Sequence, residues 1–312
     1  MMLKKIYNGI IELPRVVNHI LNISNQFADL QMKIESQSVL IGNLQSKLLI
    51  EERKSINDSE FKVFSQFGDD GIIQYLIQKI DIGSKTFIEF GVENYTESNT
   101  RFLLLNNNWK GMVMDGSQKN IDFIKKDDLY WRHDLTAVKA FIDKDNINNI
   151  INENGFSGDL GILHIDIDGN DYWVWDSVTA VNPEIVIVEY NSVFGFDNPW
   201  TVQYDPKFVR SDYNHNNLYW GVSLLSLCEL AEQKGYDFVG CNDGGNNAYF
   251  VRKDKMKKLI KLTPEQGYKE SKFREALDAK GNLSYLSGTD RLAAIKGMEV
   301  YNTRLKKTEK IQ

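Results

Sequence analysis

The chain has 312 residues, of which 42% are hydrophobic and 26% charged, as in a globular domain of ordinary size with an appendage. Its net charge of −6 argues against a nucleic-acid partner, which would need a basic face. No run of about 18 apolar residues is present, so no transmembrane segment is predicted. Two cysteines without a CxxC pair, and no secretory signal pattern, favour a reducing cytoplasm.

Residues 1–55 follow the pattern of a coiled coil. Their seam positions alternate in steps of three and four over about five heptads, and all are apolar except Gln37: Leu13, Val16, Ile20, Ile23, Phe27, Leu30, Ile34, Gln37, Ile41, Leu44 and Leu48. We expect this helix to make the protein a homo-oligomer. The alternative is a single amphipathic helix packed back onto the main domain. A membrane-surface helix fits less well, because the polar face is not enriched in Lys and Arg.

Residues 60–255 alternate strand and helix patterns, which predicts an α/β domain with a Rossmann-like, mainly parallel sheet. A helix is expected from Asp69 to Ile80 and another over Val222–Lys234. The predicted strands are Thr86–Phe90, Met112–Met114, a short strand before Asp134, Gly161–Asp166 and Ile185–Tyr190. Tyr236–Cys241 and Ala248–Lys253, joined by NDGGNN, are expected to form a C-terminal antiparallel hairpin. Residues 256–312 form a charged extension, packed on the domain, in which no chemistry is visible.

Acidic side chains close most of these strands. Glu89 ends the first strand and Asp115 the second, while Asp134 follows the short third one. The stretch HIDIDGND places Asp166 and Asp168 after the next strand, and Glu189 ends the last. Open parallel sheets bind their ligands at the carboxyl ends of their strands, where a carboxylate accepts hydrogen bonds from a ribose diol.

The loop after the first strand contains Gly91 within a polar segment that includes Glu93 and Asn99. Glycine permits a close approach of backbone and ligand. The full GxGxxG fingerprint of NAD enzymes is absent, as is the GxxxxGK[ST] loop of ATPases. DIDGND imitates a calcium loop, but its glycine is misplaced and a buried strand precedes it, so an EF-hand is rejected.

Five motifs in this order, EFG, DGS, HDL, IDIDGND and IVIVEYN, resemble S-adenosylmethionine-dependent methyltransferases. The resemblance is greatest to the FkbM-like group of bacterial surface-polysaccharide gene clusters, and it covers about residues 60–255. It implies the class I methyltransferase sheet. It also implies that Glu89 and Gly91 line the methionine side of S-adenosyl-L-methionine, that Asp134 faces the adenine amine, and that Asp166 lies between cofactor and acceptor. The cofactor-binding set is then Glu89, Gly91, Glu93, Asn99, Asp115, Gly116, Ser117, Asp134 and Asp166.

Methyl transfer needs positioning and a base for the acceptor's proton. Asp166, Glu189 and His215, which lies in a polar aromatic loop, are the candidate catalytic residues. Asp166, Asp168 and Glu189 are also a possible set of ligands for Mg²⁺ or another divalent metal. The resemblance implies as acceptor a hydroxyl of a nucleotide-linked sugar or surface glycan, or else an amine or phosphoramidate. The rival functions are an NAD(P)-dependent sugar oxidoreductase and a non-catalytic assembly scaffold.

Overall fold

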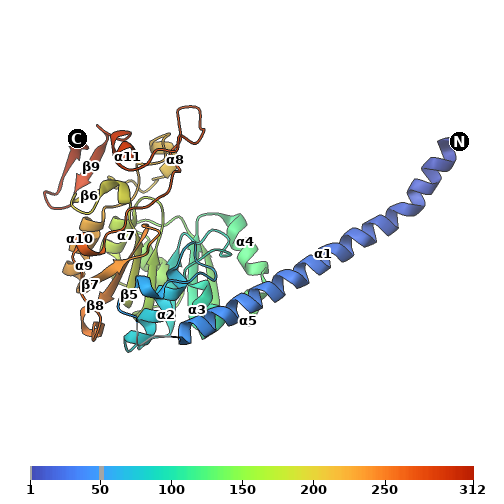
Figure 1. The fold of residues 1–312 in the computed structure, drawn as a ribbon, viewed down its shortest axis with the longest axis horizontal. Coiled ribbons are helices and arrows are strands. Elements are labelled where there is room, and N and C mark those ends of the chain that lie inside the picture. Colours follow the sequence, from blue (N-terminus) through green and yellow to red (C-terminus); the bar gives the residue numbers. More distant parts are fainter. Residues whose placement is uncertain (1, 49–52) are drawn as a thin grey trace.

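A computed structural model describes residues 2–48 and 53–312 of the chain. Its centre is a seven-stranded sheet with the order β3-β2-β1-β4-β5-β8-β7 (Figure 1). Strands β1 to β5 are parallel, and β8 is antiparallel to both of its neighbours, β5 and β7. The bounds are β1 Thr86–Phe90, β2 Lys110–Asp115, β3 Leu135–Lys139, β4 Gly158–Ile165, β5 Val181–Glu189, β7 Tyr236–Cys241 and β8 Asn247–Arg252. The predicted fold class, a mainly parallel α/β sheet that ends in an antiparallel hairpin, is confirmed.

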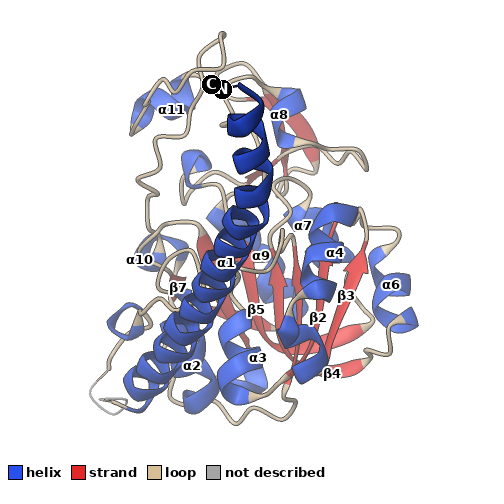
Figure 2. Cartoon of the chain, turned by 90° about the vertical axis from the view of Figure 1, so that its right-hand side faces the viewer, coloured by secondary structure: helices blue, strands red, loops and turns tan. Residues whose placement is uncertain are grey.

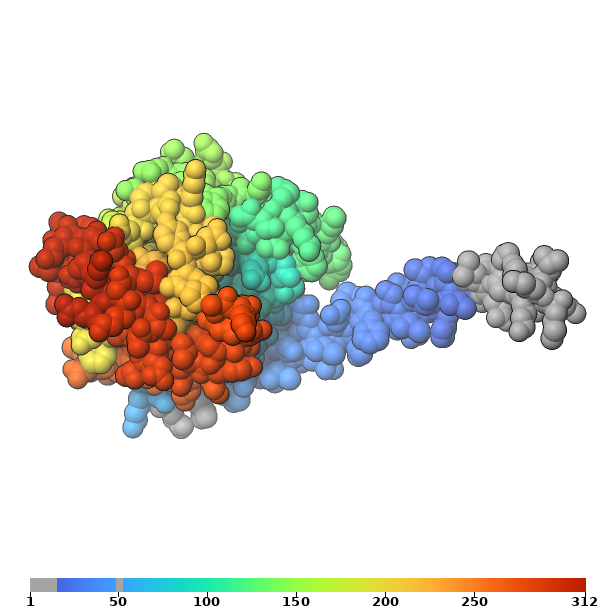
Figure 3. All heavy atoms as spheres, turned by 90° about the horizontal axis from the view of Figure 1, so that it is seen from above, coloured from blue at the N-terminus to red at the C-terminus, as the bar shows by residue number. Residues whose placement is uncertain are grey.

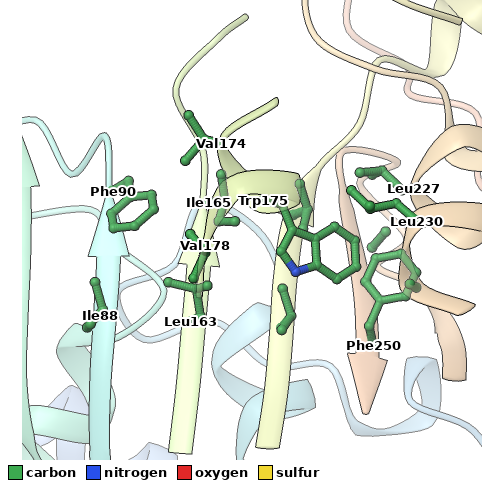
Figure 4. Packing of buried hydrophobic residues seen from close by; sticks show 14 of the residues in the cluster. Ile88, Phe90, Leu163, Ile165, Val174, Trp175, Val178, Leu227, Leu230 and Phe250 are labelled. Carbon is green, nitrogen blue, oxygen red and sulfur yellow. The ribbon is translucent and has the colours of Figure 1, made fainter. Parts of the chain in front are cut away.

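Helices cover both faces of this sheet, because alternate side chains of its buried strands are apolar on each side. One face packs against α6 (Ile147–Glu153), α7 (Asp171–Ser177) and α9 (Leu224–Lys234). Figure 4 shows part of that core, in which Trp175 of α7 lies between the strands and Leu227 of α9. The other face packs against α2 (Asp69–Lys79), α3 (Arg101–Asn107), α4 (Gln118–Lys126) and α5 (Asp128–Arg132).

A smaller layer stands beside the carboxyl edge of the sheet. Its three antiparallel strands, in the order β10-β9-β6, are Lys307–Lys310, Glu299–Asn302 and Trp200–Thr201. The short helices α8 (Arg210–Tyr213) and α11 (Thr289–Ala293) lie in this layer, whereas α10 (Pro264–Gly267) packs against β7 and α9. A separate apolar cluster, including Phe194, Trp220 and Ile295, holds this layer together. The residues after 256 are thus tied to the loops that follow β5.

The N-terminal part of helix α1 (Met2–Lys47) extends away from the body, and its C-terminal turns pack beside α2 and α3 (Figures 1 and 2). Its last turns pack closely, because a Cβ on Gly42 would lie 2.5 Å from Val63 and 2.8 Å from Phe102. Glu35 forms an ion pair with the buried Arg101, 2.7 Å away. In the described part of the chain, no helix combines the length and the apolar character that crossing a bilayer requires.

Candidate functional site

The carboxyl ends of the central strands open onto a cavity of about 730 Å³. Most of the site residues predicted from the sequence line it: Glu89, Gly91, Glu93, Asn99, Asp115, Gly116, Asp166, Asp168 and Glu189. They come from four strand ends that are far apart in the sequence, so the parallel topology is what brings them together. Three predicted residues, Ser117, Asp134 and His215, are not among the lining residues.

Gly91 marks the closest approach of two of these strand ends. Its φ is +70°, and a Cβ built on it would lie 1.7 Å from the carbonyl oxygen of Asp166. Its N–H donates to the carbonyl of Met114, 2.9 Å away. No other residue type fits both the left-handed conformation and this contact. Gly91 therefore fixes the loop after β1 against the residue expected to take the acceptor's proton.

Glu89 is buried, and its carboxylate is hydrogen-bonded to several groups of the protein. Its carboxylate accepts hydrogen bonds from the Ser98 hydroxyl at 2.6 Å, the N–H of Asn99 at 3.0 Å, and both the N–H and the hydroxyl of Thr100. His164 Nδ1 lies 2.9 Å from the same carboxylate. A carboxylate has about four lone-pair sites, so little capacity is left for a ligand. Glu89 acts by holding the 98–100 loop in the cavity wall.

The pKa values of this pair follow from their contact. Burial would raise the pKa of Glu89, but the hydrogen bond and charge of His164 bring it below its ordinary value. Burial lowers the pKa of His164, yet the hydrogen bond and charge of Glu89 raise it overall. The charged forms therefore stabilise each other. The other ring nitrogen of His164 lies 3.2 Å from Asn99 Nδ2. The neutral imidazole accepts from this N–H, whereas the protonated ring donates and requires the Asn99 amide to turn its oxygen toward it.

Asp115 lines the cavity, and one of its carboxylate oxygens is hydrogen-bonded within the protein. Its Oδ1 accepts the N–H of Ser117 at 2.7 Å and the amide of Asn120 at 3.0 Å. Its Oδ2 accepts no hydrogen bond from the described residues. The hydrogen bonds on Oδ1 orient the carboxyl group, so that Oδ2 is available for a hydroxyl of a bound molecule. Ser117 contributes through its backbone rather than as part of the cavity wall.

Asp166 and Glu189 are the carboxyl groups with the most altered acidity. Val188 pairs with Ile165 in the sheet, so Glu189 and Asp166 follow paired residues at adjacent strand ends. Burial, together with the negative charge of Asp168, raises the pKa of Asp166 to about 7. Burial and the charge of Asp166 raise the pKa of Glu189 well above its ordinary value. The protonated form of Glu189 is therefore favoured, while Asp166 is poised to gain or lose a proton near pH 7.

Asp168 does not join these two groups. It has a φ of +56°, its side chain is 57% exposed, and it accepts a hydrogen bond from Arg210 Nη1 at 2.9 Å. A second nitrogen of Arg210 lies 2.8 Å from Glu275. Among the described residues, no three acidic, His or Cys side chains are grouped so that they could hold a metal ion. The predicted ligand set of Asp166, Asp168 and Glu189 does not fit a metal, because Arg210 engages Asp168.

Two predicted site residues lie elsewhere. Asp134 precedes β3 instead of following a strand, which puts it at the opposite edge of the sheet, 3.7 Å from Lys110 Nζ. This position does not support the predicted contact with adenine, and the residues that follow β3 on the cavity side are Ala140, Phe141 and Ile142. His215 lies in an exposed turn after α8 and does not line the cavity. Its predicted role as a catalytic base is not supported by this position.

Several lining residues are not recognisable in the sequence. Asn246 and Asn247 come from the NDGGNN turn, which the sequence predicts only as a hairpin connection. Phe273 and Arg274 come from the extension in which no chemistry is visible, and Phe273 stacks on Phe67 with ring centres 5.2 Å apart. Arg210 and Trp220 pack as a cation–π pair at 4.4 Å. The pair Asn246–Asn247 at the start of a strand is the one local pattern that could have pointed to the cavity. The other missed residues reach it through contacts between distant segments.

No protein-family description matches this chain, and no curated protein does. Among solved structures, it resembles an O-methyltransferase from Bacillus cereus in complex with SAH, with 11% identity over 70% of this chain and 91% of that one and a TM-score of 0.39. The N-terminal domain of EvdMO1 with SAH bound gives 11% identity over 61% and 81%, with a TM-score of 0.39. A putative caffeoyl-CoA O-methyltransferase from Staphylococcus aureus gives 15% identity over 68% and 99%, also with a TM-score of 0.39.

These three TM-scores lie below 0.5, so the function of this chain has to be inferred from its own strand order and side chains. The cavity combines a glycine-tightened loop, a carboxylate with a free oxygen at the end of β2, and a carboxyl group titrating near pH 7 after β4. Such a site is able to bind a polyhydroxylated ligand at one end and to accept a proton at the other.

Proposed function

We propose that the protein is an S-adenosylmethionine-dependent methyltransferase that acts on a hydroxyl group of a sugar, either nucleotide-linked or part of a surface glycan. The observation that carries the proposal is that Asp115 and Asp166 line one cavity on a sheet of the 3-2-1-4-5 order closed by an antiparallel hairpin. Asp115 has an oxygen free for a diol, and Asp166 has a pKa of about 7. Binding and proton removal are thus assigned to different strand ends.

The cofactor's place follows from the residues present. Asp115 Oδ2 would accept hydrogen bonds from the ribose hydroxyls, as acidic groups at the end of a second strand do in nucleoside-binding sheets. The backbone near Gly91, with Glu93, lies on the side expected for the methionine portion. Ala140, Phe141 and Ile142 offer a largely apolar surface for the adenine. When bound, S-adenosylmethionine supplies a methyl group on a positively charged sulfur.

The chain's own residues then prepare the acceptor. Ionised Asp166 would take the proton of the acceptor hydroxyl, which is general-base catalysis. The hydroxyl oxygen would then bond to the methyl carbon as the carbon–sulfur bond breaks and S-adenosylhomocysteine leaves. Neutral Glu189 donates a hydrogen bond nearby and avoids a second buried negative charge. The rings of Trp220 and Phe273 line the same cavity and provide apolar faces for a sugar. Excluding water and orienting the hydroxyl supply the rest of the rate.

Calorimetry with S-adenosylhomocysteine and with NADH tests this proposal against its rivals. Binding of S-adenosylhomocysteine, together with transfer of radiolabelled methyl groups to a sugar acceptor, is the expected result. Binding of NADH alone would instead support the sugar oxidoreductase, although the chain lacks the glycine fingerprint that such enzymes use. Binding of neither ligand would leave the assembly scaffold as the better function.

We further propose that α1 assembles the protein into a homo-oligomer through a coiled coil. The seam residues described, except Gln37, are 43% to 66% exposed: Val16, Ile20, Ile23, Phe27, Leu30, Ile34, Ile41, Leu44 and Leu48. Leu13, the first seam position, falls outside the described side chains. Figure 3 shows α1 projecting from the body, against which its C-terminal turns lie. A second copy is the natural occupant, because a heptad seam is complementary to itself.

A further inference from the structure

Asn247 lines the cavity, and the orientation of its side-chain amide is fixed by the protein. Its Nδ2 donates to the buried carboxylate of Asp69, 3.0 Å away, at the start of α2. Asp69 also accepts hydrogen bonds from the amide of Asn242 and the hydroxyl of Tyr249. Since a carboxylate only accepts hydrogen bonds, Asp69 fixes which end of the Asn247 amide faces it. The opposite end, Oδ1, is buried and has no hydrogen-bond partner among the described residues.

Glu189 stands beside that oxygen. It is the register partner of Asn247 in the antiparallel pair of β5 and β8, so their Cβ atoms are about 5 Å apart on one face of the sheet. Glu189 is 9% exposed, lines the cavity, and its Oε2 is buried without a partner in the described part of the chain. Two adjacent buried oxygens, Asn247 Oδ1 and Glu189 Oε2, therefore lack partners at the same wall, while the Glu189 side chain also hydrogen-bonds with Asp166. Leaving such oxygens unpaired is unfavourable, and a ligand that pairs with them removes that cost.

The charge of the cavity restricts what that ligand is. Eight carboxyl groups line it: Glu89, Glu93, Glu97, Asp115, Asp166, Asp168, Glu189 and Glu275. Among the described residues, two arginines and His164 also line it, but Arg210 is already paired with Asp168 and Glu275, and His164 with Glu89. Beside Glu189, where Asp166 and Asp168 add negative charge, a phosphate or carboxylate would be repelled. A hydroxyl is neutral, and it can donate a hydrogen bond to Asn247 Oδ1 and accept one from the Glu189 carboxyl. Hydroxyl groups therefore suit both the charge and the unpaired oxygens of this wall.

We propose that Glu189 and Asn247 form the acceptor subsite, that Asp69 orients Asn247 within it, and that the subsite takes an uncharged, hydroxyl-bearing sugar ring that carries no phosphate. This inference rests on the proposed methyltransferase function and narrows its substrate class. Asn247 Oδ1 accepts a hydrogen bond from one sugar hydroxyl, and the Glu189 carboxyl donates to another. Asp69 is a positioning residue, since it touches Asn247 and not the sugar.

The test uses the full chain saturated with S-adenosylhomocysteine. Binding of three neutral probes, the methyl α-glycosides of glucose, galactose and mannose, is compared by calorimetry with that of the matching sugar 1-phosphates. We expect at least one neutral glycoside to bind, and its 1-phosphate to bind about tenfold more weakly or worse, the equivalent of about 1.4 kcal/mol. Equal or tighter binding of the 1-phosphate, or no binding of any neutral glycoside, would overturn the proposal.

Two variants locate the subsite. Asn247→Ala should weaken glycoside binding about tenfold, the value of one hydrogen bond to a buried group, and should leave the affinity for S-adenosylhomocysteine within about twofold. Asp69→Asn should weaken glycoside binding in the same way, because an amide no longer dictates the orientation of Asn247. Asn302→Ala removes an equally buried amide away from the cavity and should change neither affinity.

The outcomes separate the two proposals. If the wild-type chain fails to bind S-adenosylhomocysteine, the proposed function fails. If it binds S-adenosylhomocysteine but Asn247→Ala binds the glycoside as the wild type does, only the subsite is wrong. If Asn247→Ala or Asp69→Asn does not fold, Asn247→Ser, which keeps a shorter polar side chain, provides the comparison, and unchanged glycoside affinity in that variant also counts against the subsite.

Discussion

Glu89 and His164 are register partners on the adjacent parallel strands β1 and β4, and they form a buried ion pair with 2.9 Å between Oε1 and Nδ1. Because paired residues of a parallel ladder point to the same face, the register itself places the imidazole against the carboxylate. The pair then holds the 98–100 loop through Glu89 and Asn99 through His164. A feature of the sheet thus fixes part of the cavity wall.

Removing one member of this pair should be costly. His164→Gln leaves the buried carboxylate without its cation, and we expect the free energy of unfolding to fall by about 3–5 kcal/mol, measured by urea denaturation. Arg132→Ala is the control, because it breaks the exposed pair with Asp128, which should contribute about 1 kcal/mol or less. Equal losses in the two variants would contradict a buried charged pair.

The stability difference between the wild type and His164→Gln should depend on pH in a defined way. The pKa of His164 is raised on folding, so its contribution is complete below its unfolded pKa of about 6.5 and is lost as the pH rises through the folded value. The pKa of Glu89 is lowered, so its contribution is lost as the pH falls through its folded value. The stability difference between wild type and His164→Gln should therefore be largest near pH 5–6 and should shrink in alkaline buffer.

The rate of methyl transfer should follow the ionisation of Asp166. Because the pKa of Asp166 is about 7 and only the ionised form accepts a proton, the rate should rise between pH 6 and 8 and then level off. Asp166→Asn should lower the rate constant about 10²–10⁴-fold and abolish this inflection. Asp176→Asn, on the exposed surface of α7, removes the same charge and should keep the wild-type profile. A persistent inflection in Asp166→Asn would assign the base elsewhere.

Asp115 should determine cofactor affinity. Asp115→Ala removes the oxygen expected to accept from the ribose, and we expect the Kd for S-adenosylhomocysteine to rise about 10- to 100-fold, the range of a hydrogen bond to a charged group. The exposed Asp122 on α4 serves as the control, and Asp122→Ala should bind as the wild type does. Calorimetry measures both, and an unchanged Kd in Asp115→Ala would move the ribose to another part of the cavity.

Gly91→Ala should damage both stability and activity. Gly155 has a similar φ of +79°, and a Cβ added to it would have no atom within 4 Å, so Gly155→Ala isolates the cost of the left-handed backbone, about 1–2 kcal/mol. Gly91→Ala adds the contact with the Asp166 carbonyl and should cost about 1–3 kcal/mol more. It should also slow methyl transfer. Thermal unfolding measures the stability of both variants. Equal losses of stability would show that the contact with the Asp166 carbonyl is unimportant.

The seam of α1 should control assembly. Phe27→Lys places a charge at an exposed seam position, whereas Met32→Lys makes the same change off the seam on an equally accessible part of the helix. Sedimentation velocity should show a smaller species for Phe27→Lys alone, because a buried lysine disfavours the coiled coil. A monomeric wild type, or identical behaviour of all three chains, would refute self-association through the seam.

The position of a site residue can be predicted from the sequence where that residue directly follows a long apolar strand. The run ending at Ile165 and the one ending at Val188 mark their carboxyl ends clearly, so Asp166 and Glu189 are correctly predicted at strand ends. The short β3 carries no such signal, which is why Asp134 is assigned to the wrong end. The contacts of Asn247 and Phe273 depend on segments more than a hundred residues apart, as with Asp69 or Phe67, and no local pattern encodes them.

The two walls of the cavity come from different parts of the chain, one from loops of the main sheet and the other largely from irregular segments. The wall assigned to the cofactor is made by loops that directly leave β1, β2 and β3, where each change also disturbs the sheet. Much of the opposite wall, including Phe273, Arg274 and Glu275, belongs to irregular segments beside the second sheet. Substitutions there can alter the molecule that is recognised while the methyl donor's site persists. Chains sharing this architecture can therefore diverge in acceptor choice without first losing the capacity to fold.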